Sequence, residues 1–330
     1  MKKNQSVDLL HGPIFKSLSL LAIPIMATYF IQMAYNLVDM LWIGFLGSGA
    51  VASVGVSGNF MYLANGLVNM PKIGSQALVG QSLGANNKKE TKNYIEAAFQ
   101  SSILFALIYG IIIIVFQKNL IQLFNLKDST IIQDAQNYLW ITCGFIIFSF
   151  VNQIFTGILT AAGHSKNTFI ATTTGLVLNL ILDPVLIFIC NLRVIGAALA
   201  TIIAQIIVTL VFLYDAKKLD LFQEIKLLSK PDKNHISKIL KIGFPPSIQS
   251  MLFTCISMYI ARLISSFGAI SVAVQKVGSP FHGWLPMDLA HLSMRSLRKI
   301  MEQKTIIEFK KVIKLECLSL VYGDCLLHVY

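Results

Sequence analysis

Charged residues are scarce in this sequence of 330 residues. Asp, Glu, Lys and Arg make up 13% of it, hydrophobic residues make up 55%, and the mean hydropathy is +0.67. Soluble domains carry about a quarter charged residues. Between residues 17 and 71 only Asp39 is charged, and apolar runs of roughly 20 residues can span a bilayer. The sequence excludes a soluble enzyme and a nucleic-acid-binding protein, and it predicts an all-α polytopic membrane protein.

Two further absences narrow the class of protein. Residues 1–16 are polar and lack the apolar core and cleavage site of a signal peptide, so we expect the first apolar run to remain as a helix. The five cysteines form no CxxC or other metal-type spacing. We interpret them as small buried hydrophobic residues and expect no cofactor.

Apolar segments predict the order of the transmembrane helices. The first six are 17–43, 50–71, 94–116, 136–161, 167–190 and 194–214. A seventh run begins near residue 244 and an eighth near residue 269. We therefore expect a six-helix lobe (1–214), a cytoplasmic linker (215–243) and the start of a second lobe (244–279), with about 7–8 of an expected 12 helices.

Lys and Arg are distributed unevenly between the two sides of the predicted membrane. The N-terminal tail has three, the connection after the second segment four, the turn between the fourth and fifth one, and the linker seven. The other side has three. Because basic loops remain in the cytoplasm, fifteen against three predicts a cytoplasmic N-terminus in the plasma membrane. The second connection contains Lys72, Lys88, Lys89 and Lys92.

A weak internal repeat relates the two predicted lobes. At an offset of 221 residues, Ile23-Pro24 aligns with Phe244-Pro245, and two further dipeptides match in register. Six helices per unit leave both lobes in the same orientation. Residues 280–330 do not continue the repeat, and 12 of these 51 residues are charged. We expect an out-of-frame tail on a truncated chain; a soluble tail that docks on the cytoplasmic surface is the alternative.

Two carboxylates lie well inside the first six apolar segments, Asp39 and Asp183, whereas Glu96 lies only at the start of the third. An ionisable group in the bilayer core costs about 2.5–3.5 kcal/mol on insertion scales, so each is a candidate functional residue. Asn179 shares a helical face with Asp183, and Pro184 removes one backbone N–H and frees the carbonyl of Leu180. Carboxylates beside free carbonyls suit a proton or a hard cation.

Further polar residues share helical faces with this predicted site. Gln32, Tyr35 and Asn36 precede Asp39 at helical spacing, and Thr201 and Gln205 are four residues apart on the sixth segment. Their simplest role is to hydrogen-bond neighbouring helices. The other interpretation is that Gln32, Tyr35, Asn36 and Gln205 line a substrate cavity.

Several short motifs occur in a characteristic order between about residue 10 and residue 279. They are Ile23-Pro24, Tyr35 to Asp39, Gly47-x-x-Ala50-Val51-Ala52, Val79-Gly80-Gln81-x-x-Gly84-Ala85, Ala161-Ala162-Gly163, Asn179-x-x-x-Asp183-Pro184 and Gly243-Phe244-Pro245. In this order they resemble the multidrug and toxic compound extrusion (MATE) family, and within it the bacterial multidrug efflux branch.

The resemblance implies a two-lobed carrier of twelve helices that exports cationic amphipathic compounds in exchange for inward Na⁺ or H⁺. It further implies that Asp39, Asn179, Asp183 and Thr201 form the ion site, which either Na⁺ or H⁺ would occupy, and that the first helix bends at Pro24. Pro184 is the second expected bend.

Three alternatives stay open. A lipid-linked oligosaccharide flippase of the related exporter superfamily would need several Arg or Lys residues in its cavity, and the first six segments contain essentially none. A membrane-embedded prenyl transferase would need a DDxxD-like cluster, which the sequence lacks. A nonfunctional fragment is compatible with the composition of residues 280–330.

Overall fold

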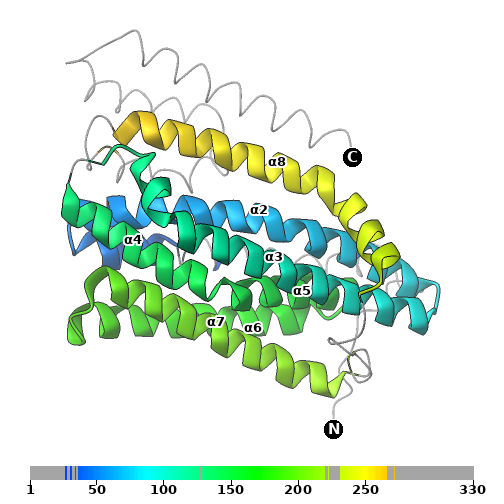
Figure 1. The fold of residues 1–330 in the computed structure, drawn as a ribbon. Coiled ribbons are helices and arrows are strands. Elements are labelled where there is room, and N and C mark those ends of the chain that lie inside the picture. The colour runs from blue at the N-terminus through cyan, green and yellow to red at the C-terminus, as the bar shows by residue number, and fades with distance from the viewer. Residues whose placement is uncertain are drawn as a thin grey trace, which may run out of the picture.

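The computed structural model describes residues 36–126, 128–219 and 231–265, together with residues 27, 30, 31, 34, 222 and 271. Long helices lie alongside one another in a bundle, with α8 and α2 at one side and α6 and α7 at the other (Figure 1). Among these residues, five helices are long and apolar enough to cross a membrane, or six if a bent pair forms one span. The prediction of an all-α membrane fold is confirmed.

The helices follow the predicted apolar segments. They are α2 (Ser48–Gly84), α3 (Lys88–Gln122), α4 (Ser129–Gly144), α5 (Ile146–Ala161), α6 (Ser165–Pro184), the π-helix η1 (Val185–Ile189), α7 (Arg193–Lys218) and α8 (Lys233–Ser265). The segment predicted as one helix over 136–161 is divided into α4 and α5, which are bent by 50° relative to each other. The seventh apolar run lies inside the longer α8, which continues through Pro245 and Pro246.

Some of the predicted features fall outside the described residues. The first apolar segment is described mainly at its end, where residues 36–44 are helical. Pro24, Gln32 and Tyr35 lie outside the described part, as do the eighth apolar run apart from Ser271 and the tail 280–330. The predictions made for them stay predictions.

Polar side chains define where three of the helices begin. Asn87 accepts a hydrogen bond from the backbone N–H of Glu90 (3.1 Å) at the start of α3, and Asp128 accepts one from Thr130 (2.8 Å) at the start of α4. Asp232 caps α8 in the same way. Such caps satisfy backbone donors that the first turn leaves unpaired. The Thr130 side chain and backbone also hold the pKa of Asp128 below its usual range.

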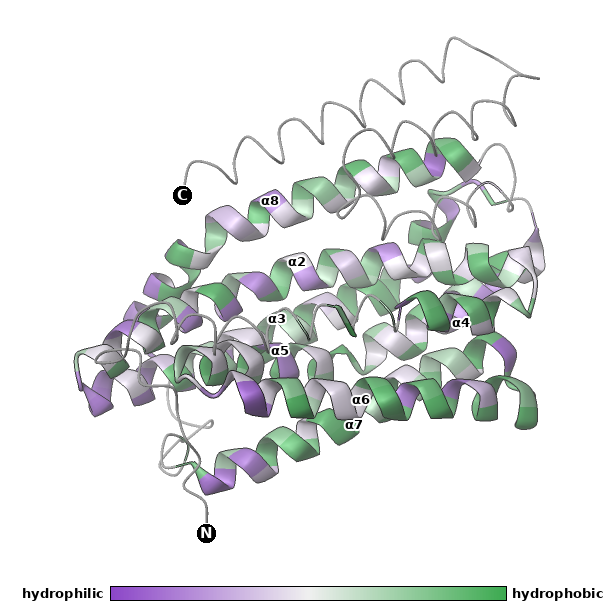
Figure 2. Cartoon of the chain, turned by 180° about the vertical axis from the view of Figure 1, so that it is seen from behind, coloured by the Kyte–Doolittle hydropathy of each residue, from purple (hydrophilic) through white to green (hydrophobic). Residues whose placement is uncertain are grey.

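Apolar residues cover most of the helical surface, whereas hydrophilic residues gather toward helix ends and interrupt α2 (Figure 2). Large apolar side chains of α3 are exposed over several turns, including Leu104, Ile108, Ile111 and Val115. Exposed apolar side chains on a helix of this length are expected where it faces lipid tails rather than water. The surface therefore agrees with a membrane setting.

Helices α2 and α8 pack with their backbones in direct contact. Gly74 of α2 lies against the carbonyl of Ile239, and Gly243 of α8 lies against the carbonyl of Met70; a Cβ at either glycine would collide with the facing backbone. Small residues allow this close approach in membrane helix pairs.

One sequence-based placement is wrong. We expected Lys72 in the cytoplasmic connection after the second segment, but α2 continues through Pro71 to Gly84, and Lys72 lies within the helix. The residues after Lys72 are almost all uncharged and compatible with a helix, so the lysine does not end it. The side chain of Lys72 is consequently placed in the interior of the bundle.

Candidate ion site and cavity

The end of α6 buries a carboxylate beside an amide. Asp183 is fully buried and Asn179 is 2% exposed. The Nδ2 of Asn179 donates a hydrogen bond of 3.3 Å to Oδ1 of Asp183, as their four-residue spacing predicts. Oδ1 of Asn179 is buried and has no hydrogen-bond partner among the described residues. This oxygen is available to a ligand.

Pro184 changes the helix directly after Asp183. Proline lacks an N–H, so the regular hydrogen-bond ladder cannot continue through it. The chain forms the π-helix Val185–Ile189, and the N–H of Cys190 donates to the carbonyl of Val185 at 2.9 Å. Gly196 of α7 packs against this π-helix, where a Cβ would lie 2.6 Å from the carbonyl oxygen of Leu186. Single π-turns inside helices are frequent at functional sites.

The carboxylate of Asp39 reaches the same place from residues 36–44. Asp39 is 9% exposed, and its side chain interacts with that of Asp183. Tyr138 of α4 is buried within electrostatic range of both carboxylates and interacts with the side chain of Thr201. Thr201 donates its hydroxyl proton to the carbonyl of Ala197 (3.0 Å), which leaves its oxygen lone pairs available.

The structure thus brings together the four residues that the resemblance implies, Asp39, Asn179, Asp183 and Thr201, and adds Tyr138. The described part of the chain contains no group of three or more His, Cys, Asp or Glu side chains that could hold a metal ion. A cation at this site would therefore rest on two carboxylates and neutral oxygens, a set that suits a proton or a hard monovalent ion.

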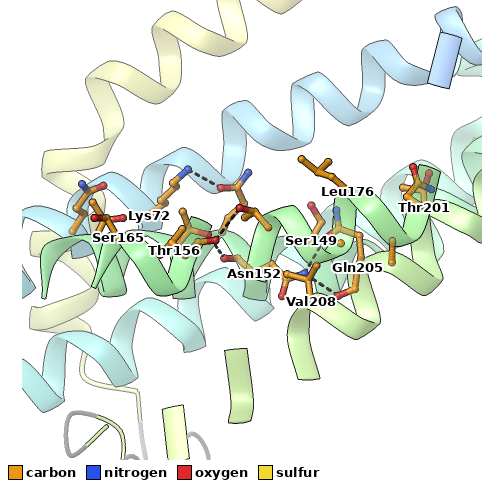
Figure 3. Close-up of a pocket in the computed structure, with 17 residues that line it drawn as sticks. Lys72, Ser149, Asn152, Thr156, Ser165, Leu176, Thr201, Gln205 and Val208 are labelled. Atoms are coloured by element: carbon orange, nitrogen blue, oxygen red, sulfur yellow. Dashed lines mark hydrogen bonds between the residues drawn. The ribbon is translucent and has the colours of Figure 1, made fainter. Parts of the chain in front are cut away.

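A cavity of about 330 Å³ begins beside this site and lies between α2, α5, α6 and α7. Most of the residues that line it carry polar side chains. The hydroxyl and amide groups come from Gln76, Ser149, Asn152, Gln153, Thr156, Thr160, Ser165, Thr168, Thr172, Asn179, Thr201 and Gln205. Figure 3 shows Lys72 and Ser165 toward one end of the cavity and Thr201 at the opposite end. The cavity connects the candidate ion site with the Lys72 side of the bundle.

Asn152 holds the middle of the cavity wall in place. Its Nδ2 donates to the backbone carbonyl (3.0 Å) and Oε1 (2.8 Å) of Gln205, and its Oδ1 accepts from Thr209 at 2.8 Å. Gln205 lines the cavity, whereas Asn36 is half-buried and does not. Sequence reasoning missed Lys72 and the polar face of α5, although Ser149, Asn152, Gln153, Thr156 and Thr160 recur there at helical spacing.

Comparison with known proteins identifies the family that this chain resembles. Residues 24–185 match the family model described as MatE. The resemblance to the MATE family is confirmed over these residues. The multidrug export protein MepA of Staphylococcus aureus (strain NCTC 8325 / PS 47) is 26% identical to this chain over 278 residues, which cover 83% of this chain and 61% of that protein. MepA of Staphylococcus saprophyticus is 26% identical over 283 residues, again covering 61% of the relative.

Solved MATE structures share the fold. The inward-facing conformation of a multidrug resistance MATE family transporter of the MOP superfamily superposes with a TM-score of 0.70 at 24% identity, covering 75% of this chain and 57% of that one. A MATE structure in complex with MaD3S gives a TM-score of 0.73 at 22% identity, covering 86% and 69%. These superpositions confirm the predicted all-helical, multi-pass membrane fold. The chain spans about 61% of the length of the MepA relatives.

Proposed function

We propose that this protein takes part in multidrug efflux as a cation-coupled antiporter. Inward movement of H⁺ or Na⁺ through the Asp39–Asp183 site would drive export of small amphipathic molecules across the plasma membrane, with the N-terminus on the cytoplasmic side. The relatives named multidrug export protein support the direction and the breadth of transport. The buried pair of carboxylates is the observation on which the coupling proposal rests.

Two carboxylates in one low-dielectric site cannot both stay charged without compensation. Either one of them takes up a proton or the pair shares a cation. Asn179 supplies an unpartnered oxygen at this position, and Thr201 supplies lone pairs at the adjoining end of the cavity. Both forms of coupling therefore have ligands, and binding or release of the ion changes the net charge of a site that adjoins the π-helix after Pro184.

The substrate class is proposed from the resemblance to multidrug exporters and from the lining of the cavity. The resemblance to multidrug exporters favours amphipathic small molecules, and cationic compounds were expected from it. A polar cavity with an apolar stretch formed by Leu176, Ala204 and Val208 agrees with an amphipathic ligand.

One observation in the structure favours the flippase alternative. It required basic residues in the cavity, and Lys72 is such a residue. A pyrophosphate headgroup carries more negative charge than one ammonium group balances, and multidrug efflux therefore remains the better-supported function.

The coupling proposal is tested by Asp183→Asn in cells that express the full chain. Asparagine keeps the shape of aspartate but neither exchanges a proton nor contributes a negative charge. We expect export of a fluorescent cation such as ethidium to fall to the level of cells without the protein. Asp128→Asn is the matched control, because this residue caps α4 outside the cavity and asparagine is an equally good cap. Undiminished export by Asp183→Asn at equal membrane abundance would contradict the proposal.

A further inference from the structure

Lys72 places a positive charge in the wall of the cavity. It is the one charged residue among the 17 described residues that line it. Its Nζ donates a hydrogen bond of 2.6 Å to Oε1 of Gln153, a neutral amide. A partly buried ammonium whose partner is neutral keeps much of its desolvation cost, which a negatively charged ligand group would offset.

The N-terminus of α6 lies toward the same end of the cavity. The helix begins at Ser165, which is 3% exposed and lines the cavity, and His164 before it provides no side-chain cap. Figure 3 shows Lys72, Ser165 and Thr156 together, away from Thr201. Backbone N–H groups and the positive end of the helix dipole favour an anion at such a position. Lys72 and α6 therefore contribute positive potential from two different helices.

Thr168 adds an unsatisfied donor one turn further along α6. Its side chain lines the cavity, the residue is 5% exposed, and its Oγ1 has no hydrogen-bond partner in the described part of the chain. Buried hydroxyl groups are nearly always hydrogen-bonded, so an unpaired one in a cavity wall indicates a group that enters the cavity. The hydroxyl of Thr168 can donate to an anionic oxygen.

The amount of charge and the shape of the cavity restrict the ligand. One ammonium and one helix end balance about a single negative charge, which corresponds to a carboxylate rather than a phosphate dianion. The volume of about 330 Å³ is that of a small-molecule pocket, and Leu176 and Val208 provide an apolar wall. We propose that the Lys72 end of the cavity binds the carboxylate of a small amphipathic molecule through Lys72, Ser165 and Thr168.

This inference changes the expected substrate class from purely cationic compounds to compounds that carry a carboxylate, zwitterions included. Binding of such a compound does not depend on ion coupling. The further step, that the bound compound is the one exported, rests on the proposed efflux function.

The test compares two probes of nearly equal shape, dansylglycine with a carboxylate and dansylglycinamide without one. Each is titrated into the purified full chain in detergent micelles, and the dansyl fluorescence of protein-free micelles is subtracted. We expect dansylglycine to bind about tenfold more tightly or better, as one charge-assisted hydrogen bond provides. Equal affinity for the two probes would overturn the proposal, and this comparison needs no variant.

Variants then locate the carboxylate. Lys72→Met keeps the length of the side chain and removes its charge, and we expect it to abolish the preference for dansylglycine while the amide binds as before. Lys118→Met is the matched control, since Lys118 is exposed at the end of α3 and does not line the cavity. A preference that survives Lys72→Met, or that Lys118→Met removes equally, would overturn the assignment.

The outcome of this titration does not depend on the export experiment with Asp183→Asn. The titration uses no ion gradient, so a failure to bind dansylglycine leaves the effect of Asp183→Asn on export to be judged by itself. Conversely, selective binding with no export supports the carboxylate site and contradicts the efflux proposal.

Discussion

Helix α2 lies between two regions that are built in opposite ways. Toward α8 the two backbones touch at Gly74 and Gly243, and no space remains for a side chain. Toward α5 the side chain of Lys72 lines a polar cavity of about 330 Å³. The first region depends on the absence of side-chain atoms and the second on hydrogen bonds around an open volume. Substitutions that add volume should therefore damage one region, and substitutions that remove polar groups should damage the other.

The largest effect is expected from Gly243→Ala. The new Cβ would collide with the carbonyl of Met70, which is backbone and cannot rotate away. Overpacking of this kind costs about 1–3 kcal/mol. We expect a clear decrease in the midpoint of thermal unfolding of the full chain in detergent micelles.

Gly80→Ala is the matched control for this substitution. Gly80 also lies within a long helix, but its nearest neighbour would be 3.9 Å from the new Cβ. Alanine in a helix interior is favoured over glycine by up to about 1 kcal/mol, so the midpoint should stay or rise. If both variants lose the same stability, the contact between α2 and α8 is not as close as the structure shows.

Part of the fold and of the candidate site could be predicted from the sequence, but only where the information is local. Apolar runs predict the helices because a bilayer requires about 20 apolar residues in each. The pairing of Asn179 with Asp183 follows from their spacing, and it is present as a 3.3 Å hydrogen bond. The bend between Gly144 and Ile146 could not be predicted, because an uninterrupted apolar run containing no proline covers it.

The parts of the site that depend on helix packing could not be predicted from the sequence. Tyr138 comes within reach of Asp39, Asp183 and Thr201 only because α4 packs against α7, and nothing in its own segment distinguishes it. The sequence predicts Lys72 in the connection after the second segment, because the apolar run 50–71 ends directly before it. Its position inside α2 follows from the continuation of the helix to Gly84.

A smaller effect is expected in the cavity region from Asn152→Ala. The truncation leaves Oε1 of Gln205 and the hydroxyl of Thr209 without their partner on α5. Unpaired buried polar groups cost about 1–3 kcal/mol, less if water enters the space and replaces the lost bonds. We expect a moderate decrease in the thermal midpoint.

Thr168→Val is the control that separates structural from ligand-directed polar groups. The hydroxyl of Thr168 has no partner among the described residues, so replacing it by a methyl group of similar size should leave the midpoint unchanged or raise it. The same variant should bind dansylglycine more weakly. A loss of stability as large as that of Asn152→Ala would show that the Thr168 hydroxyl serves the fold.

The smallest expected effect is a pH dependence of the folding stability that arises at His164, in the connection between α5 and α6. Burial lowers the pKa of His164 below its ordinary value of 6.5, and the nearby Asp215 opposes this shift without reversing it. The unfolded chain therefore binds a proton at higher pH than the folded chain. Stability is fully present above about pH 6.5 and is lost as the pH falls through the lower pKa of the folded state.

We expect the thermal midpoint to decrease slightly between about pH 7.5 and about pH 5.5, and His164→Asn to reduce that decrease, because asparagine does not titrate. His235→Asn serves as the comparison, since His235 lies at the start of α8 between Asp232 and Glu90. Asn167 donates to Asp215 at 3.0 Å across α6 and α7, so the carboxylate that opposes the pKa shift of His164 also joins two helices that line the cavity. A steeper loss of stability at acid pH in His164→Asn than in the parent chain would contradict a neutral, partly buried His164 and place the acid-sensitive group elsewhere.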